Sequence, residues 1–184
     1  MKPILSILFA LLALSVTACD KADSPVQPTP TTAPLTASPG IRVEHSAVAP
    51  GKGKAMVLTA NQSVSGSLDS GNGGQLEALG VRMGNYRNSA DGSLSLKLCV
   101  EGACQEALMP LAGSKDNDFL VFELPQPIVL AKAQKIDYIL TRSGDATNRV
   151  AVWAYPARKG QAGLTDPAGT KTDLVPRLEL HLSK

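Results

Sequence analysis

Two cysteines, Cys99 and Cys104, flank the dipeptide Glu101-Gly102. If that dipeptide forms a two-residue hairpin turn, Cys99 faces Cys104 at a non-hydrogen-bonded position. The Cα atoms there approach to about 4.5 Å, a separation that a disulfide accepts. Metal ligation is the alternative, but no nearby histidine or third cysteine completes a site. We therefore predict a Cys99–Cys104 disulfide, which an oxidising compartment would keep closed.

Residues suited to catalysis are few. The two histidines are His45 and His181, and His181 falls on the polar phase of an alternating segment, where we expect it to face solvent. The motifs Gly-x-Ser-x-Gly, Ser-x-x-Lys and His-Glu-x-x-His do not occur. A Ser-His-Asp site stays open as an alternative, because triads are assembled in space. The sequence predicts a non-enzymatic protein, and we assign no catalytic residue.

Two short segments are compatible with ion or phosphate binding. Asp116-Asn117-Asp118 offers oxygen ligands of the kind that Ca²⁺ prefers, but such a run before a strand is usually a turn. Gly51-Lys52-Gly53-Lys54 lacks the spacing and the following helix of a phosphate loop. We therefore predict neither a metal site nor a cofactor.

The aromatic residues Trp153 and Tyr155 lie two positions apart, so in a strand they share one face. The opposite face would carry Val150, Val152 and Ala154. If the valines point inward, the indole and phenol form a platform on which a sugar ring can stack. Polar residues that could bind the sugar hydroxyls lie nearby: Arg158, Asn148 and Asp145. Because the chain has so few aromatic residues, we favour an interpretation in which Trp153 fills the core, and keep Trp153, Tyr155 and Arg158 as candidate glycan-binding residues.

Alternation of polar and apolar residues dominates the chain after Gly40, and a period of two predicts strands with one buried face. The clearest examples are Ser93–Leu98, Lys135–Leu140, Arg149–Val152 and Arg177–Leu182. Phe119–Leu124 is apolar on both faces, which is typical of a central strand. Further candidate strands are Val57–Thr59, Val64–Leu68 and Leu76–Met83.

Turn residues separate these segments at fairly regular intervals, and no long segment has the period of an amphipathic helix. This pattern predicts an all-β fold: a single jelly-roll-like β-sandwich over residues 41–184. Ala103–Leu111 is ambiguous between strand and helix, and the residues around Ala131–Ala133 could form one helical turn.

The N-terminus has the layout of an export signal. Lys2 precedes the apolar run Ile4–Leu14, which is shorter than the roughly 20 residues of a membrane-spanning helix. The following Val16-Thr17-Ala18-Cys19 resembles the lipobox of bacterial lipoproteins. That resemblance implies diacylation of the Cys19 thiol, cleavage of the signal peptide 1–18 and acylation of the new amino terminus. A secreted protein or an uncleaved anchor helix is the alternative.

Several acyl chains hold a protein stably on a membrane, whereas one does so only marginally. We expect a membrane partner through the Cys19 anchor, in the bacterial cell envelope and facing the periplasm. Asp20 resembles the inner-membrane retention signal of enteric bacteria, and the outer membrane stays open as an alternative.

Residues 19–40 contain five prolines, many hydroxyl side chains and almost no large apolar ones. Such a composition favours an extended, disordered tether between anchor and domain. Beyond residue 18 the chain has 17 basic and 16 acidic side chains, because Lys2 is the one charge in the signal peptide. This balance gives no electrostatic reason to expect nucleic acid as a partner.

One further resemblance covers roughly residues 60–182. It rests on Asp116–Pro125, Val150–Trp153, Gly163-Leu164, Thr172–Leu174 and Arg177. Together these segments resemble the jelly-roll domains of bacterial surface-polysaccharide and membrane glycosyltransferase proteins, although Pro176 interrupts the last motif. The resemblance implies a carbohydrate-binding-like sandwich without catalysis, and fold alone does not fix function.

These observations lead to one main functional hypothesis: a membrane-anchored periplasmic lipoprotein whose β-sandwich binds an envelope glycan or an envelope protein. One alternative is a structural or accessory subunit of a cell-envelope assembly. Another is an inhibitor of a host hydrolase, for which the sequence offers no recognisable signature.

Overall fold

The computed structural model describes residues 40–184. The expected signal peptide, Cys19 and the expected tether up to residue 39 lie outside the described residues. Every regular element within residues 40–184 is a strand, so the all-β prediction is confirmed. No helix in this part of the chain is long and apolar enough to span a bilayer.

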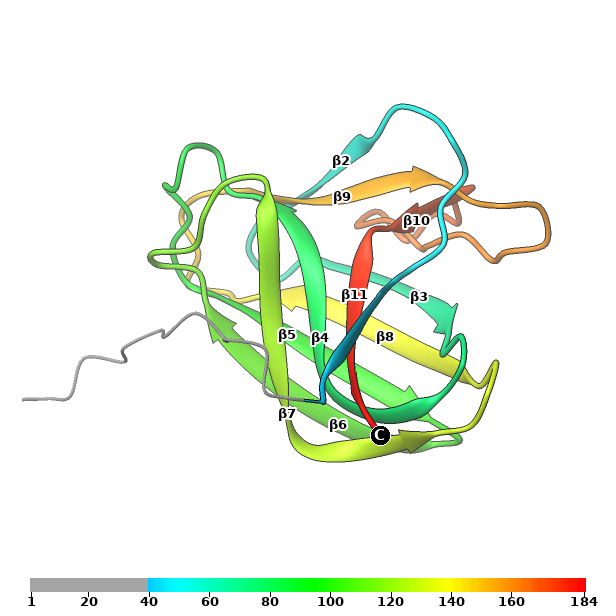
Figure 1. The fold of residues 1–184 in the computed structure, drawn as a ribbon. Helices are drawn as coiled ribbons and strands as arrows, with labels where there is room; N and C mark the ends of the chain where they lie inside the picture. Colours follow the sequence, from blue (N-terminus) through cyan, green and yellow to red (C-terminus); the bar gives the residue numbers. More distant parts are fainter. Residues whose placement is uncertain (1–39) are drawn as a thin grey trace, which may run out of the picture. The chain divides into compact units, whose positions relative to one another are not determined.

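The strands follow one another along the chain and are coloured from blue to red in Figure 1. They are β1 (Arg42–His45), β2 (Lys54–Leu58), β3 (Ser63–Asp69), β4 (Gly74–Gly84), β5 (Ser93–Val100), β6 (Ala103–Pro110), β7 (Asp118–Leu130), β8 (Lys135–Arg142), β9 (Val150–Pro156), β10 (Leu174–Pro176) and β11 (Leu178–Ser183).

Two antiparallel sheets pack face to face. The four-stranded sheet has the order β3-β8-β5-β6. In the seven-stranded sheet β2, β9, β4 and β7 are successive neighbours, while β11 pairs with β4 and β1, and β10 pairs with β9. The order β2-β9-β4-β7 over β3-β8-β5-β6 is that of an eight-stranded jelly roll, so the predicted jelly-roll-like sandwich is confirmed.

Alternate residues of the strands meet between the sheets and form the core. Each large aliphatic side chain buried there contributes about 1.5–3 kcal/mol relative to exposure. Fully buried examples come from both sheets: Leu94, Leu96, Leu98, Ile136 and Leu140 from the four-stranded sheet, and Leu79, Val81, Val150, Val152 and Leu178 from the seven-stranded sheet.

The segment Phe119–Leu124 is not a central strand, as its apolar pattern had suggested. It belongs to β7, which pairs with β4 alone and lies at an edge of the seven-stranded sheet. Leu120 and Phe122 point into the core, while Phe119 and Val121 lie half-buried on the outer face. The apolar outer face of β7 therefore contributes to a surface rather than to a second layer.

Two ambiguous segments have definite structures. Ala103–Pro110 forms β6, and Leu111 follows the strand; within β6, Ala107 faces the core in register with Leu96. Ala131–Ala133 forms a turn and no helix, with Ala133 at a φ of 55° and its N–H donating to Gly71 O. The helical turn considered for this segment is wrong.

The hairpin between β5 and β6 has the predicted geometry. Glu101 and Gly102 both have positive φ, 51° and 86°, as a two-residue type I′ turn requires. Cys99 and Cys104 are directly opposite each other with Cα atoms 4.1 Å apart, and their sulfur atoms are bonded. The disulfide prediction is confirmed.

Candidate functional site on the outer face of the seven-stranded sheet

Trp153 and Tyr155 lie together on the outer face of β9. Val150, Val152 and Ala154 occupy the inner face and are fully buried. The two aromatic residues keep intermediate exposure. The interpretation in which Trp153 fills the core is therefore wrong, because smaller aliphatic side chains already fill the space between the sheets at this strand.

The Trp153 indole has a fixed position. Its Nε1 donates a hydrogen bond of 2.8 Å to Asn117 Oδ1, in the loop that precedes β7. A Cβ atom on Gly84 would lie 3.3 Å from the same nitrogen, so the indole rests closely on the backbone of β4. The Nε1 edge of the indole is thus held by a hydrogen bond, and the Trp153 side chain stays half-exposed.

Tyr155 also rests against a glycine. A Cβ atom on Gly53 would lie 2.9 Å from Tyr155 Cε1, so any larger residue there would displace the phenol ring. Gly53 lies just before β2 and is followed by Lys54, which pairs with Ala154 of β9. Both aromatic rings therefore cover glycine backbone and are positioned by it.

The run Asp116-Asn117-Asp118 is a turn whose side chains have protein partners. Asp116 accepts hydrogen bonds from Asn85 N at 2.7 Å and Arg87 N at 3.2 Å, and the first of these contributes most to lowering its pKa. Asn117 holds the indole. Among residues 40–184, no group of three or more histidine, cysteine or acidic side chains is arranged to hold a metal ion.

Arg158 lies in the loop after β9. Its Nε donates to Val48 O at 3.2 Å, and it lines a hollow of about 320 Å³ together with Ser46, Leu68 and Gln161. The structure therefore fixes the base of the guanidinium against the segment that leads into β2. It records no direct contact between Arg158 and either aromatic ring.

The two histidines come together at one carboxylate, which sequence reasoning missed. His45 Nδ1 lies 3.6 Å from Glu179 Oε1, and His181 Nε2 lies 3.5 Å from Glu179 Oε2. Glu179 and His181 are mostly covered, with side chains 17% and 16% exposed. His181 lies on the outer face of its strand, as expected. The expectation that it faces solvent is wrong, because neighbouring side chains cover the ring.

This cluster lies on Gly80 in the middle of β4. A Cβ atom on Gly80 would lie 3.1 Å from Glu179 Oε2 and 3.5 Å from Phe119 Cδ1. The Phe119 ring also contacts His45, with centroids 6.0 Å apart. The missing side chain at Gly80 is therefore what allows these groups to pack close to the sheet.

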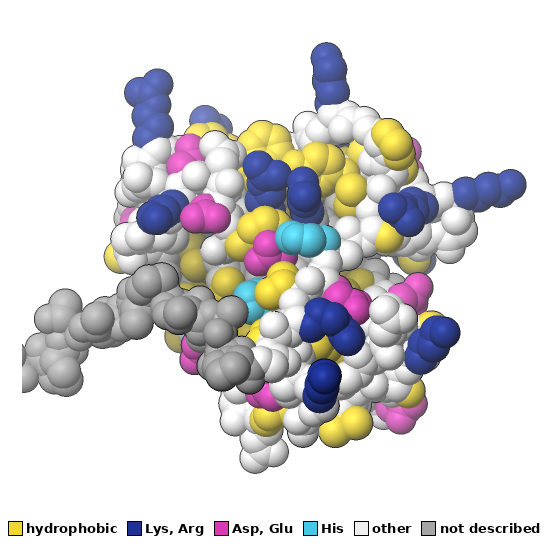
Figure 2. Space-filling model, viewed as in Figure 1, with side chains coloured by type: hydrophobic (Ala, Val, Ile, Leu, Met, Phe, Trp, Pro, Cys, Tyr) yellow, Lys and Arg dark blue, Asp and Glu magenta, His cyan; other side chains and the backbone are white. Residues whose placement is uncertain are grey.

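Arg82 and Arg177 lie on the same outer face. Their neighbours Val81 and Leu178 are paired and buried, so the arginines point the opposite way. Figure 2 shows histidine, acidic and basic side chains gathered on one face of the domain. No sequence motif identifies Arg82 and Arg177 as neighbours, because the two residues meet only through the pairing of the strands.

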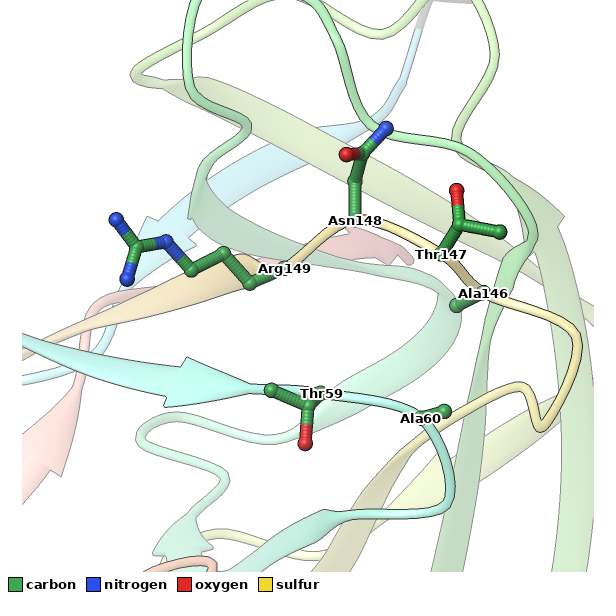
Figure 3. A pocket seen from close by; sticks show the side chains of 6 residues that line it. All are labelled: Thr59, Ala60, Ala146, Thr147, Asn148 and Arg149. Carbon is green, nitrogen blue, oxygen red and sulfur yellow. The ribbon is translucent and has the colours of Figure 1, made fainter.

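A larger hollow, of about 470 Å³, lies elsewhere, between the end of β2 and the loop that enters β9. Its lining is shown in Figure 3: Thr59, Ala60, Ala146, Thr147, Asn148 and Arg149. Asn148 Nδ2 donates to Ser89 O, and Arg149 lies over the Tyr86 ring at 4.8 Å. Because these polar groups already have partners, we place the candidate site on the outer face instead.

No protein-family model, curated protein or solved structure matches this chain. The outer face nevertheless combines fixed aromatic rings, a histidine–carboxylate cluster and two arginines. Such a surface is suited to binding a polar ligand with apolar faces.

Proposed function

We propose that this chain is a non-enzymatic, lipid-anchored protein of the bacterial cell envelope whose β-sandwich binds a glycan. The observation that carries the proposal is the position of Trp153 and Tyr155, side by side in one strand face outside the core. Sugar rings have apolar C–H faces and polar edges, and an aromatic ring with one free face complements them.

The rings are held in place before any ligand arrives. Gly84 and Gly53 let the backbone support them, and Asn117 fixes the indole edge. A preorganised side chain loses little conformational entropy on binding, which favours affinity. Arg158 extends the proposed surface, since its terminal nitrogens have no recorded partner in the described part of the chain.

Binding without catalysis is supported by the surroundings of the histidines. Both imidazoles face Glu179, and the structure records no hydrogen bond from either to a serine, threonine or cysteine within residues 40–184. When histidine activates a nucleophile, the two side chains lie within hydrogen-bond reach, at about 2.6–3.2 Å or somewhat farther apart before substrate binds. We therefore assign this cluster a structural part in the binding face.

The location is proposed from the lipobox. Cys19 would carry the lipid anchor, and the proline-rich segment would hold the domain away from the bilayer on the periplasmic side. Replacing Cys19 with serine is expected to leave an unprocessed or soluble protein, measured by membrane fractionation and by the mass of the mature chain. Unchanged membrane partitioning and trimming in this variant would contradict the anchor.

The glycan proposal is tested on the full-length protein in detergent micelles. Trp153 is the single tryptophan of the chain, so tryptophan fluorescence reports on this site alone. Peptidoglycan fragments and envelope polysaccharides are titrated, and at least one is expected to change the emission and to release heat in calorimetry. No response from any of them would sink the proposal.

Variants then locate the site. Trp153→Ala and Tyr155→Ala are each expected to weaken binding about fivefold, because an aromatic stacking contact contributes on the order of 1 kcal/mol. Tyr86→Ala is the matched control, since Tyr86 is an exposed aromatic residue in a different loop. Equal losses in all three variants would place the ligand away from β9.

A further inference from the structure

Arg82 of β4 and Arg177, the residue between β10 and β11, form a pair of like charges. Arg82 N donates to Arg177 O at 3.1 Å, which places the two residues directly opposite each other. Both side chains lie on the outer face and are half-buried. Like charges directly opposite in a sheet destabilise it, so this arrangement has a cost in the absence of an anion.

Neither arginine has a carboxylate within ion-pair distance among residues 40–184. The nearest acidic residue along β11 is Glu179, and both of its oxygens face the histidines. Other arginines differ: Arg42 pairs with Glu44 at 2.9 Å, and Arg142 pairs with Asp91 at 3.1 Å. Toward the other side chains of residues 40–184, the two guanidinium groups on the outer face thus form no ion pair and no hydrogen bond.

The pair lies between aromatic residues. Arg82 is the register partner of Phe119, and Arg177 N donates to Trp153 O at 3.1 Å. The arginines therefore share this face with the proposed stacking platform. Guanidinium groups bind carboxylate and phosphate through paired hydrogen bonds, which makes them suited to an acidic substituent on a sugar.

We propose that Arg82 and Arg177 bind the carboxylate or phosphate group of an acidic glycan whose sugar ring stacks on Trp153. This inference rests on the proposed glycan binding and specifies its substrate class. The anion would offset the repulsion between the two arginines and occupy their free donors. Neutral glycans would gain stacking alone.

The test uses the full-length protein in micelles and two matched pairs of probes. Oligogalacturonate is compared with its methyl ester, and a phosphorylated mannan oligosaccharide with its dephosphorylated form. At least one acidic probe is expected to bind tenfold more tightly than its neutral partner, and the pair that shows it identifies carboxylate or phosphate. The preference should disappear in Arg82→Gln/Arg177→Gln and persist in Arg149→Gln.

The failures are distinguishable. Equal affinity within both pairs, or a preference that survives in the double glutamine variant, overturns the acidic subsite and leaves glycan binding intact. No binding of any probe, acidic or neutral, also overturns the acidic subsite, while the Trp153 titration with envelope glycans decides glycan binding itself. The double variant should unfold at the same or a higher temperature, because a like-charge contact is removed. If it does not fold, Arg82→Lys and Arg177→Lys carry the test, since lysine keeps the charge but loses the paired hydrogen bonds.

Discussion

The guanidinium of Arg142 lies 3.1 Å from the carboxylate of Asp91 at one end of the sandwich. Arg142 is fully buried at the end of β8, and its Nη1 also donates to Ser93 O. Asp91 in turn accepts the hydroxyl and N–H of Thr147 and the N–H of Asn148. One carboxylate therefore balances a buried charge and fixes the loop that leads into β9, the strand of Trp153.

Asp91→Asn is expected to lower the midpoint of thermal unfolding clearly, because a buried guanidinium without its counter-charge is destabilising. The control is Asp137→Asn, which removes an exposed ion pair with Lys135. Exposed pairs contribute little to stability. Calorimetry should show a much larger decrease for Asp91→Asn, and equal decreases would contradict this function of Asp91.

The same carboxylate predicts a pH dependence. The Thr147 hydroxyl, followed by the Asn148 N–H, lowers the pKa of Asp91 from 3.8 to about 2. Because the pKa is lower in the folded than in the unfolded chain, the contribution of Asp91 is complete above about pH 4 and is lost as the pH falls toward 2. Urea unfolding between pH 2 and 5 should show a steeper acid decline in the wild type than in Asp91→Asn. Parallel curves would show that another group controls the acid response.

Local spacing allowed the hairpin to be predicted from sequence. Cys99 and Cys104 are separated by a turn of two residues, so their distance follows from strand geometry alone. Alternation likewise identified most of the strands and their buried faces. The short β1 and β10 escaped notice, because four and three residues give too little periodicity.

The binding face could not be predicted in the same way. Alternation shows which side of a strand a residue occupies, but not which strand lies beside it. Glu179 meets His45 through the pairing of β1 with β11, and Arg82 meets Arg177 through that of β4 with the start of β11. The position of Trp153 could not be predicted either, because both faces of β9 are apolar. Alternation therefore does not show which face of this strand packs into the core.

The disulfide closes a short loop, so its effect on stability should be modest. Chain-entropy arguments give about 2 kcal/mol for a loop of this size. Cys99→Ala/Cys104→Ala is expected to fold with its free energy of unfolding lowered by about that amount, measured in urea. Reduction of the wild type should lower stability equally and leave the double variant unchanged. Failure of the variant to fold would show that the hairpin depends on the bond.

Gly66 in β3 is opposite Tyr138 in β8, whose side chain is 2% exposed. A Cβ atom on Gly66 would collide with the phenol oxygen and ring of Tyr138. Gly66→Ala is therefore expected to destabilise the domain by about 1–3 kcal/mol, the usual cost of overpacking a core. Tyr138→Phe removes the first atom that the new methyl group meets, so the double variant Gly66→Ala/Tyr138→Phe should lose less stability than the sum of the single changes. Urea unfolding of the four proteins measures this coupling, and strict additivity would rule out the contact as the cause.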